Sequence, residues 1–405
     1  MSKNTGEGLG APLAVPLFRR LWLGNMVSNF GWLIQSVAAA WLMTELVGTA
    51  DWVALVQTAL LLPILLLALP AGVLADVGDR RRVCMLGQSI MVLAALLLGL
   101  CTLLDVTGPG LLLAFTFLLG AGSAFANSPF QTIVREAVPV PAMAAAVTLN
   151  AISFNIARTV GPALGGLLVA SIGAEAAFLT NAFCYLPLLL VLALWRRPPV
   201  RTAIRGRMLR AFGDGLRFAR ESEKIRAVLL YCAVFSLCAS SIQGLLPLIA
   251  RDRLGGDAVT FGLLLGAFGI GAMGGAFLVH PARRRFGTGP VVTWLGLQLA
   301  FSTLVIAFTA SLPLLAIALA LAGVAWLGSF SSFNIAVQQA SAAGLEARQL
   351  AIYQTMTFGS MAAGSWLWGE MAHFFDVGVA LAGSGLVLLA GSFWAWRLVR
   401  ILRPA

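Results

Sequence analysis

Arg158 is the residue whose position most needs a chemical explanation, because it is a cation inside an apolar run. The run covers residues 144–172, and at ~1.5 Å per helical residue Arg158 would lie about 21 Å from its start. A charge that deep in a bilayer costs roughly 2.5–3.5 kcal/mol on insertion scales, so it must face a wet cavity or a partner. We expect Arg158 to attract an anionic substrate or to pair with an acid. The alternative is a fixed hydrogen bond to helix ends or amides.

Uncharged polar side chains recur at helical spacing in several other apolar runs. In residues 21–46 they form one stripe of amide, indole and hydroxyl groups, at positions 25, 29, 32 and 36. Amides in lipid need partners, so such stripes face inward, where they either line a central cavity or bond one helix to another. As a set they favour a cavity. Its candidate lining residues are Asn25, Asn29, Trp32, Gln35, Asn127, Asn150, Asn155, Arg158, Ser240, Gln243, Asn334 and Gln338.

Glycine, aspartate and arginine mark the end of the second apolar run, at Gly72, Asp76 and Arg80–Arg82. A glycine at position 72 would let two helices approach closely. A carboxylate at a helix end can meet a neighbouring helix N-terminus or an arginine. A basic loop that only fixes orientation is the simpler interpretation.

The same glycine-to-arginine spacing returns in the second part of the chain, at Gly275 and Arg283–Arg285, with Val279 at the position of the aspartate. The same offset pairs Gly161 with Gly364. One offset that fits separate places indicates an internal duplication, and two similar membrane halves are the usual construction of a secondary transporter.

Small residues and a proline cluster just after Arg158, at Gly161, Pro162, Gly165 and Gly166. The glycines remove side chains from a helix face, and the proline bends or loosens the helix. This pattern suits a hinge or a tight seal between the two halves. Ordinary packing of small residues would produce a similar pattern.

The composition requires a membrane. The 405 residues are 60% hydrophobic and 11% charged, with a mean hydropathy of +0.92, which a lipid-facing surface needs and a soluble core does not. We therefore predict an all-α membrane protein with twelve transmembrane helices in two pseudo-symmetric six-helix bundles. The predicted segments are 21–46, 52–75, 83–104, 110–131, 144–172, 175–195, 227–249, 258–280, 290–310, 312–335, 349–370 and 377–398.

Basic residues fix the predicted orientation. Of the 27 Lys and Arg residues, only Arg251 and Arg253 fall in an odd-numbered loop and only Arg158 falls within a segment. Basic loops stay on the cytoplasmic side, so we expect a multi-pass protein of the bacterial inner membrane with both termini in the cytoplasm. The net charge of +11 therefore reflects topology and anionic lipid headgroups, and no nucleic acid is expected as a partner.

The predicted division is a first bundle at residues 1–195, a cytoplasmic linker at 196–226 and a second bundle at 227–405. Within the linker, Met208, Leu209, Phe212 and Leu216 share one helical face. This pattern predicts a helix on the membrane surface. A solvated basic linker is the alternative.

Enzyme chemistry and metal binding have no basis in the sequence. The five cysteines form no C-x-x-C pair, and the two histidines have no metal-ligand spacing. There is no P-loop motif of the G-x-x-x-x-G-K-[ST] type. We expect no cofactor, and a monomer is compatible with the pattern.

The chain resembles the major facilitator superfamily over nearly its whole length. Within it, the chain is similar to the branch of the enterobactin exporter and related bacterial efflux proteins. The residues that carry the branch resemblance are Phe18–Trp22, Ser28–Gly31, Ala75–Asp76, Asp79–Arg82, Leu149–Asn150, Asn155–Arg158, Asn334, Gln338, Tyr353–Gln354 and Gly364–Gly369.

The resemblance implies export of a small amphipathic molecule, siderophore-like or drug-like, by alternating access with proton antiport. It implies a conformational latch at Gly72, Asp76, Arg80 and Arg81, although Val77 stands where the family often has arginine. It also implies a titratable proton carrier. The better candidates are Glu45 and Glu370, and both lie near segment ends.

Two other functions remain open. A lysophospholipid flippase, of the kind that related branches include, would have lateral openings and lipid substrates. A non-transporting membrane receptor or assembly factor could keep the same fold. A further departure from the drug–proton antiporters is the lack of an arginine in the fourth segment, at Leu118–Gly122.

Overall fold

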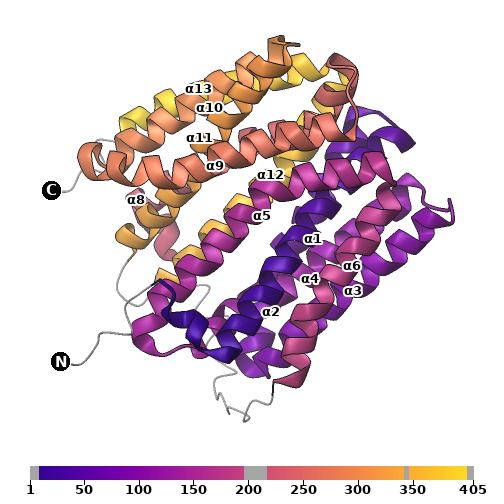
Figure 1. Ribbon diagram of the computed structural model, residues 1–405. Helices are drawn as coiled ribbons and strands as arrows, with labels where there is room; N and C mark the ends of the chain where they lie inside the picture. Colours follow the sequence, from indigo (N-terminus) through magenta and orange to yellow (C-terminus); the bar gives the residue numbers. More distant parts are fainter. Residues whose placement is uncertain (1–8, 196–216, 342–345, 399–405) are drawn as a thin grey trace.

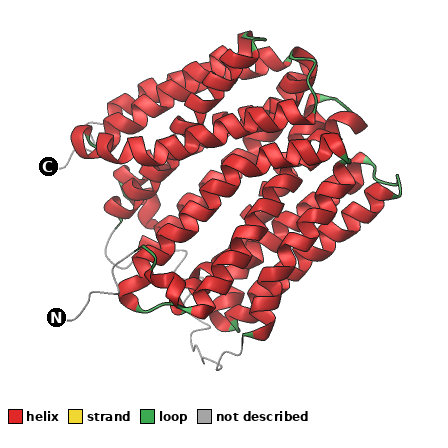
Figure 2. Cartoon of the chain, in the orientation of Figure 1, coloured by secondary structure: helices red, strands yellow, loops and turns green. Residues whose placement is uncertain are grey.

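The computed structural model describes the chain apart from residues 1–8, 196–216, 342–345 and 399–405. The described part is helical, and its connections are short loops (Figure 2). Its twelve long helices are α1 (Pro16–Leu46), α2 (Ala50–Val77), α3 (Arg80–Leu103), α4 (Pro109–Glu136), α5 (Met143–Ser171), α6 (Ala174–Leu194), α8 (Glu223–Leu248), α9 (Ala258–Phe286), α10 (Thr288–Phe308), α11 (Leu312–Ala340), α12 (Glu346–Phe374) and α13 (Val377–Leu398). The short helices are η1 (Ala11–Ala14), η2 (Val140–Ala142) and η3 (Ile249–Arg253).

Local sequence explains where several helices begin. The side chain of Asp79 accepts a hydrogen bond from the Arg81 amide and so caps α3, and Asp257 caps α9 through the amide of Thr260. These bonds satisfy amide groups that have no partner within the helix. Glycines in the left-handed region, Gly48 (φ 73°) and Gly287 (φ 85°), make two of the tight connections.

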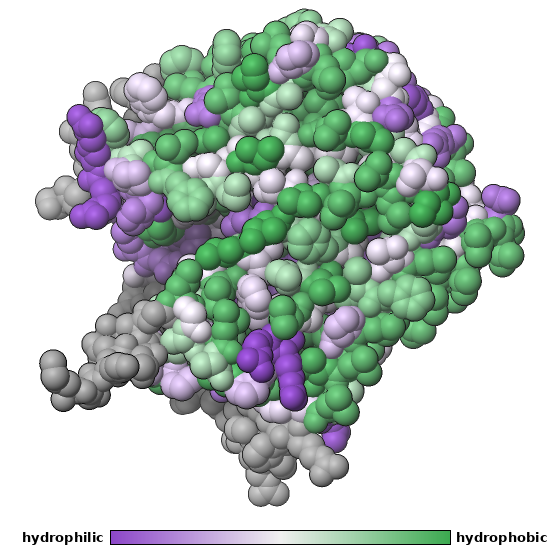
Figure 3. All heavy atoms as spheres, in the orientation of Figure 1, coloured by the Kyte–Doolittle hydropathy of each residue, from purple (hydrophilic) through white to green (hydrophobic). Residues whose placement is uncertain are grey.

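Eleven of the described helices are long and apolar enough to cross a membrane. The remaining long helix, α12, has 29 residues but carries more polar side chains, and it packs against α2 and α8. The prediction of a multi-spanning all-α protein is therefore confirmed, while eleven of the twelve predicted spans meet the criterion by length and composition. Hydrophobic side chains cover most of the face seen in Figure 3, and hydrophilic ones gather mainly toward its left and right margins.

The helices form two sets of six whose packing follows the same scheme. In the first set α2 packs on α4, α3 on α6 and α1 on α5. The equivalent pairs in the second set are α9 with α11, α10 with α13 and α8 with α12. The sets meet along two seams, α5 with α9 and α2 with α12, which the same equivalence exchanges (Figure 1). This repeated pattern is what a duplicated six-helix unit produces.

The two ends of the helical bundle differ in charge. The basic end holds Arg80–Arg82, Arg135 and Arg283–Arg285, and α1 begins and α13 ends there. The opposite end holds the loops at 47–49, 172–173, 254–257 and 309–311.

The predicted division at residues 196–226 stays a prediction. The apolar face expected at Met208, Leu209, Phe212 and Leu216 lies outside the described residues.

Candidate functional site

Glycine permits a very close approach of α5 and α9, which belong to different sets. A Cβ at Gly166 would overlap the Ala258 carbonyl oxygen and would lie 3.2 Å from the Gly262 Cα. On the other helix, a Cβ at Gly262 would lie 2.5 Å from the Pro162 carbonyl oxygen. Backbone therefore packs on backbone at this crossing, with no side chain between the two helices.

The other two glycines of the predicted seal face a different neighbour. A Cβ at Gly161 would lie 2.9 Å from the Leu33 Cβ, and one at Gly165 would lie 3.0 Å from the Ile34 Cα. Both contacts are with α1, which is in the same set as α5. The motif therefore has two roles in the structure: Gly161 and Gly165 fix α5 to α1, and Gly166 joins α5 to the second set.

The second seam, between α2 and α12, is also close-packed toward the opposite end. Ser365 Oγ donates to the Ala54 carbonyl oxygen at 2.9 Å, and Thr58 Oγ1 donates to the Ala362 carbonyl oxygen at 3.1 Å. A Cβ at Gly369 would overlap the Ala54 Cβ.

Charged groups join the two sets at the opposite end. The Arg251 guanidinium donates to the Thr44 carbonyl oxygen at 2.5 Å and to the Gly48 carbonyl oxygen at 3.0 Å. His373 Nδ1 lies 3.4 Å from Asp51 Oδ1. These contacts tie η3 to the end of α1, and the end of α12 to the start of α2.

The contacts between the two sets are asymmetric along the molecule. The hydrogen bonds and the His373–Asp51 contact just given, which join described residues of different sets, lie between mid-helix and the opposite end. At the basic end, Arg81 and Arg283 donate to acceptors within their own sets. In Figure 3, hydrophilic side chains lie set back in a notch at the left edge, between the two sets. The hydrogen bonds given above therefore hold the two sets together toward the opposite end of the interior.

Arg158 lies in this interior, stacked on aromatic rings of the second set. Its guanidinium carbon is 4.0 Å from the Trp326 ring centre and 5.5 Å from that of Phe268. The side chain is only partly exposed. Among the described residues it has no hydrogen-bonding or ion-pairing partner, so the fixed bond considered from the sequence is not made.

Aromatic rings continue from Arg158 toward the basic end. Trp326 contacts Phe330 with ring centres 4.6 Å apart, and Phe330 contacts Phe235 at 5.5 Å. Phe333 then links Phe235 and Tyr231, each at 5.6 Å. This aromatic row spans α9 (Phe268), α11 (Trp326, Phe330 and Phe333) and α8 (Phe235 and Tyr231). Trp326 and Phe330 are partly exposed, and the other four rings are buried.

Several predicted cavity residues bond within their own helix. Asn127 Nδ2 donates to Ser123 Oγ at 2.8 Å, and Asn155 Nδ2 donates to the Ala151 carbonyl oxygen at 2.8 Å. Gln338 likewise bonds Asn334, one turn away. Asn127 and Gln338 are exposed. These amides therefore do not tie helix to helix, and their exposure is inexpensive only where water reaches them.

Other predicted cavity residues are buried between helices or only partly exposed. Gln35 bonds Asn181 of α6 and is buried within the first set. Ser240 is buried and donates to the Leu237 carbonyl oxygen of its own helix. The remaining ones are half-buried: Asn25, Asn29, Trp32, Asn150 and Gln243.

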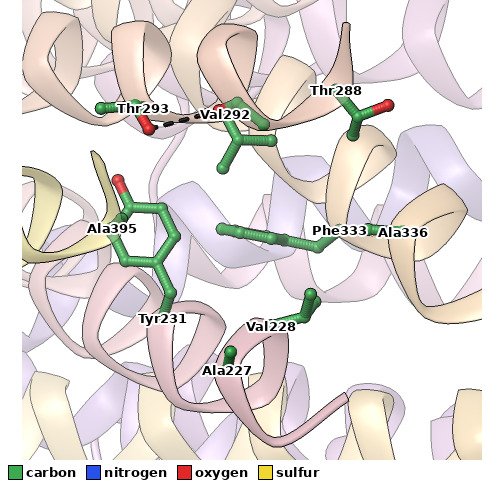
Figure 4. A pocket seen from close by; sticks show the side chains of 10 residues that line it. Ala227, Val228, Tyr231, Thr288, Val292, Thr293, Phe333, Ala336 and Ala395 are labelled. Atoms are coloured by element: carbon green, nitrogen blue, oxygen red, sulfur yellow. Dashed lines mark hydrogen bonds between the residues drawn. The ribbon is translucent and has the colours of Figure 1, made fainter. Parts of the chain in front are cut away.

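Two small pockets lie among the described helices, and both are too small for an organic substrate. The one in Figure 4, lined by Tyr231, Phe333, Val292 and Ala395, holds about 20 Å³, which is room for about one water molecule. A second, beside Trp32 and Gln35 between α1, α2 and α4, holds about 30 Å³. Neither has room for an organic substrate, so the candidate region is the interior between the two sets, where Arg158 lies.

The latch residues contact their own set in this structure. Arg80 pairs with Glu136 of α4 at 2.9 Å, and Arg81 donates to the Ala193 carbonyl oxygen at the end of α6 at 2.6 Å. A Cβ at Gly72 would meet nothing within 4 Å, so the predicted close approach is not made here. The side chain of Asp76 lies outside the described part of the structure.

The two candidate proton carriers lie near the opposite end. Glu45 is exposed and accepts a hydrogen bond from Trp41 Nε1 at 2.7 Å. Glu370 is half-buried, about one turn before the end of α12. Neither is at mid-membrane depth, so their role in coupling stays a prediction.

Sequence reasoning missed the residues that complete the seams. Gly262 is the partner of the glycine motif in α5. Gly269 meets α5 just before the motif, where its Cβ would lie 2.6 Å from the Arg158 carbonyl oxygen. Their seven-residue spacing in a glycine-rich run was the available signal. Arg251 was noted only for topology, because nothing in the sequence connects it with Thr44.

Known proteins resemble the chain in both sequence and fold. The multidrug efflux pump Tap of Mycobacterium tuberculosis is 26% identical over 377 residues, which is 88% of each chain. The staphyloferrin A transporter of Staphylococcus aureus is 26% identical over 257 residues, 62% of each chain. Among solved structures, a point mutant of the nucleoside transporter NupG has a TM-score of 0.81 at 11% identity, covering 96% of this chain and 100% of that one; at that identity the likeness shows the fold alone.

The family comparison covers the seams, the interior and both sets of helices. The model of the transmembrane secretion effector family, MFS_3, matches residues 8–402. The match agrees with the repeated six-helix packing, the glycine seams and the absence of any enzyme motif in the sequence. The chain is therefore a transporter and belongs to the transmembrane secretion effector family of the major facilitator superfamily.

Proposed function

We propose that this protein exports a small amphipathic molecule across the bacterial inner membrane by alternating access. The observation that carries the proposal is the asymmetry of the contacts between the two sets. Their bonds and glycine contacts lie between mid-helix and the opposite end, while exposed amides such as Asn127 and Gln338 lie toward the basic end. An interior that is sealed at one end and wet at the other is one state of such a cycle.

Orientation gives the cycle its direction. Basic loops favour the cytoplasmic side, so the basic end and both termini are cytoplasmic in this proposal. The described conformation then faces inward and is ready to take a substrate from the cytoplasm. The relatives of this chain that are efflux proteins support export over import.

The latch belongs to the other half of the cycle. When the opposite end opens, the basic end must close, and Gly72 would then allow α2 to meet a helix of the second set. Arg80 and Arg81 hold the ends of α3, α4 and α6 together, so in this proposal they move as one body with Asp76. Residues 1–195 and 227–405 act as the two moving bodies, and the linker 196–226 connects them.

Proton antiport supplies the energy in this proposal. The candidates are Glu45 and Glu370, near the end that would face the higher proton concentration outside the cell. Asp51 and His373 lie at the same end and belong in the same mutational series. If transport into inside-out vesicles does not depend on a pH gradient, the coupling proposal is wrong.

Export is tested by mass spectrometry of the medium and the cells. A strain without this protein is compared with the same strain carrying the wild-type chain. Export predicts a compound that disappears from the medium, accumulates in cells and returns only with the wild-type chain. A change confined to lipid composition would instead support a flippase. No change in compounds or lipids under several growth conditions would contradict transport and favour a receptor or assembly role.

A further inference from the structure

The most unusual side chain in the described interior is a cation without an anion. Arg158 stacks on Trp326 at 4.0 Å and approaches Phe268 at 5.5 Å. Its five N–H groups have no acceptor among the described residues. A cation–π contact offsets only part of the hydration that a guanidinium loses on burial.

A second unpartnered donor belongs to the ring on which Arg158 stacks. The indole Nε1 of Trp326 is buried and has no hydrogen-bond partner among the described residues. Buried donors are rarely left unpaired, and such cases require an explanation. Here the two donors belong to side chains in direct contact, one from α5 and one from α11.

The acids of the long helices lie elsewhere. Glu45, Asp51, Asp76, Glu136, Glu175, Glu223, Glu346 and Glu370 all lie within about one turn of a helix end. Among the described residues, no acid forms an ion pair with Arg158. A cationic substrate would thus meet a like charge in the middle of the interior. An anionic substrate would supply the counterion that Arg158 lacks among the described residues.

We propose that Arg158 and Trp326 bind the anionic oxygen group of the exported molecule, and that the partly exposed rings of Trp326 and Phe330 contact its apolar body. This proposal rests on the function proposed above and names the substrate class: an amphipathic organic acid with a carboxylate-like group. The guanidinium fork suits two oxygens bound side by side. Phe330 lies beyond Trp326 toward the basic end, where the apolar part of the molecule would enter, and the buried rings of Phe235 and Phe333 pack against it.

The test is binding of three matched probes to the purified full-length protein in lipid nanodiscs. They are 2-naphthoate, neutral 2-naphthamide and cationic 2-naphthylmethylammonium, which share one aromatic body. We expect naphthoate to bind at least about ten-fold more tightly than the amide, which is ~1.4 kcal/mol, and the cation most weakly. Equal binding of all three to the wild-type protein, or no binding of naphthoate, would overturn the proposal without the need for any variant.

Variants then locate the charge that is recognised. Arg158→Gln should remove the preference for naphthoate, and Arg158→Lys should keep part of it, since the charge remains but the fork is lost. Trp326→Phe should keep the aromatic surface and weaken naphthoate more than naphthamide. If Arg158→Gln elutes as a folded protein and still prefers naphthoate, Arg158 is not the anion site. If Arg158→Gln does not fold, the ratios for Arg158→Lys and Trp326→Phe decide: unchanged ratios in both overturn the proposal.

Binding and transport are read separately. Export of a neutral or cationic compound by a protein that shows no naphthoate preference would leave the exporter function intact and reject this substrate class. A naphthoate preference that depends on Arg158, in a protein that moves no compound and changes no lipid, would leave the anion site intact and reject export.

Discussion

Single residues decide how closely the two sets of helices approach each other. Gly166 and Gly262 bring backbone onto backbone at the α5–α9 seam, whereas Gly274 of α9 has nothing within 4 Å of its Cβ position. The same residue type therefore has different consequences at different faces of one helix. The energetic difference comes from overlap with a rigid carbonyl, which cannot move aside as a side chain can.

Replacing a seam glycine should open the opposite end. Gly166→Ala or Gly262→Ala overpacks the seam, at a cost of ~1–3 kcal/mol, which shifts the conformational equilibrium by about 5-fold or more. Labelling of a cysteine at position 29 by a membrane-impermeant maleimide from outside should accelerate accordingly, and export should fall. Gly274→Ala is the matched control, and equal labelling in all three variants would contradict a seam that closes the path.

The two arginines of η3 allow a similar comparison. Arg251 donates across the sets, to the Gly48 carbonyl oxygen, while Arg253 donates to the Ala307 carbonyl oxygen within the second set. Hydrogen bonds from charged groups contribute ~1.5–3 kcal/mol. We expect Arg251→Gln to increase external labelling at position 29 and Arg253→Gln to leave it unchanged, although both lower the melting temperature. A larger effect of Arg253→Gln on labelling would show that the seal lies elsewhere.

At the scale of the element, helix α9 combines a seam, an aromatic wall and a defined start. Gly262 and Gly269 face α5, and Phe268 lies beside Arg158. The faces on which these residues lie follow from their spacing, because each residue turns the helix by a fixed angle. Asp257 caps the first turn of the same helix.

The N-cap of α9 should show a defined pH dependence. Hydrogen bonds from the Thr260 amide, and then from its hydroxyl, hold the pKa of the exposed Asp257 carboxyl below its ordinary value. A depressed folded-state pKa gives stability that is present above the unfolded pKa, near 4, and is lost as the pH falls through the folded value. Asp257→Ala should therefore cost about 1 kcal/mol at pH 7, and progressively less in acid.

Melting temperatures between pH 3 and pH 7 check this prediction. Asp257→Asn is the control, because asparagine also caps helices but does not titrate. It should stay close to wild type at pH 7 and lose less stability in acid. A wild-type melting temperature with the same acid dependence as that of Asp257→Ala would mean that the cap does not contribute.

The whole molecule works only if the two sets move against each other. The same packing pairs recur in each set, and the seams exchange under that equivalence. In such a symmetric molecule, a contact between the sets that closes one end in one state has an equivalent contact that can close the other end in the other state. Motion between the sets should therefore be essential, and motion within a set should not.

A disulfide between the sets should stop export. The Cβ position of Gly244 in α8 lies 3.7 Å from the Ala54 Cβ in α2, which suits a disulfide. In a background without the five native cysteines, oxidised Ala54→Cys/Gly244→Cys should lose export and recover it after reduction. Substrate binding from the basic end should remain.

The control pair lies within the second set. The Cβ position of Gly391 in α13 is 3.9 Å from the Val234 Cβ in α8, so Val234→Cys/Gly391→Cys should cross-link equally well and continue to export. If both cross-links stop export, loss of flexibility within a set would explain the result. If neither does, rigid-body motion of the two sets is the wrong mechanism.

The sequence by itself determined the long helices and the duplication. Eleven of the twelve predicted spans are long and apolar enough to cross a membrane. These features could be predicted because apolar runs and helical periodicity are local properties of the chain. It also identified Arg158, because a charge within an apolar run is expensive wherever the helix is placed. Only the tertiary structure decided that Gly161 and Gly165 face α1 while Gly166 faces α9, that Gly72 is open in this conformation, and that Arg158 rests on Trp326. These facts depend on which faces of distant segments meet, and a helix face carries no mark in the sequence of the partner it will contact.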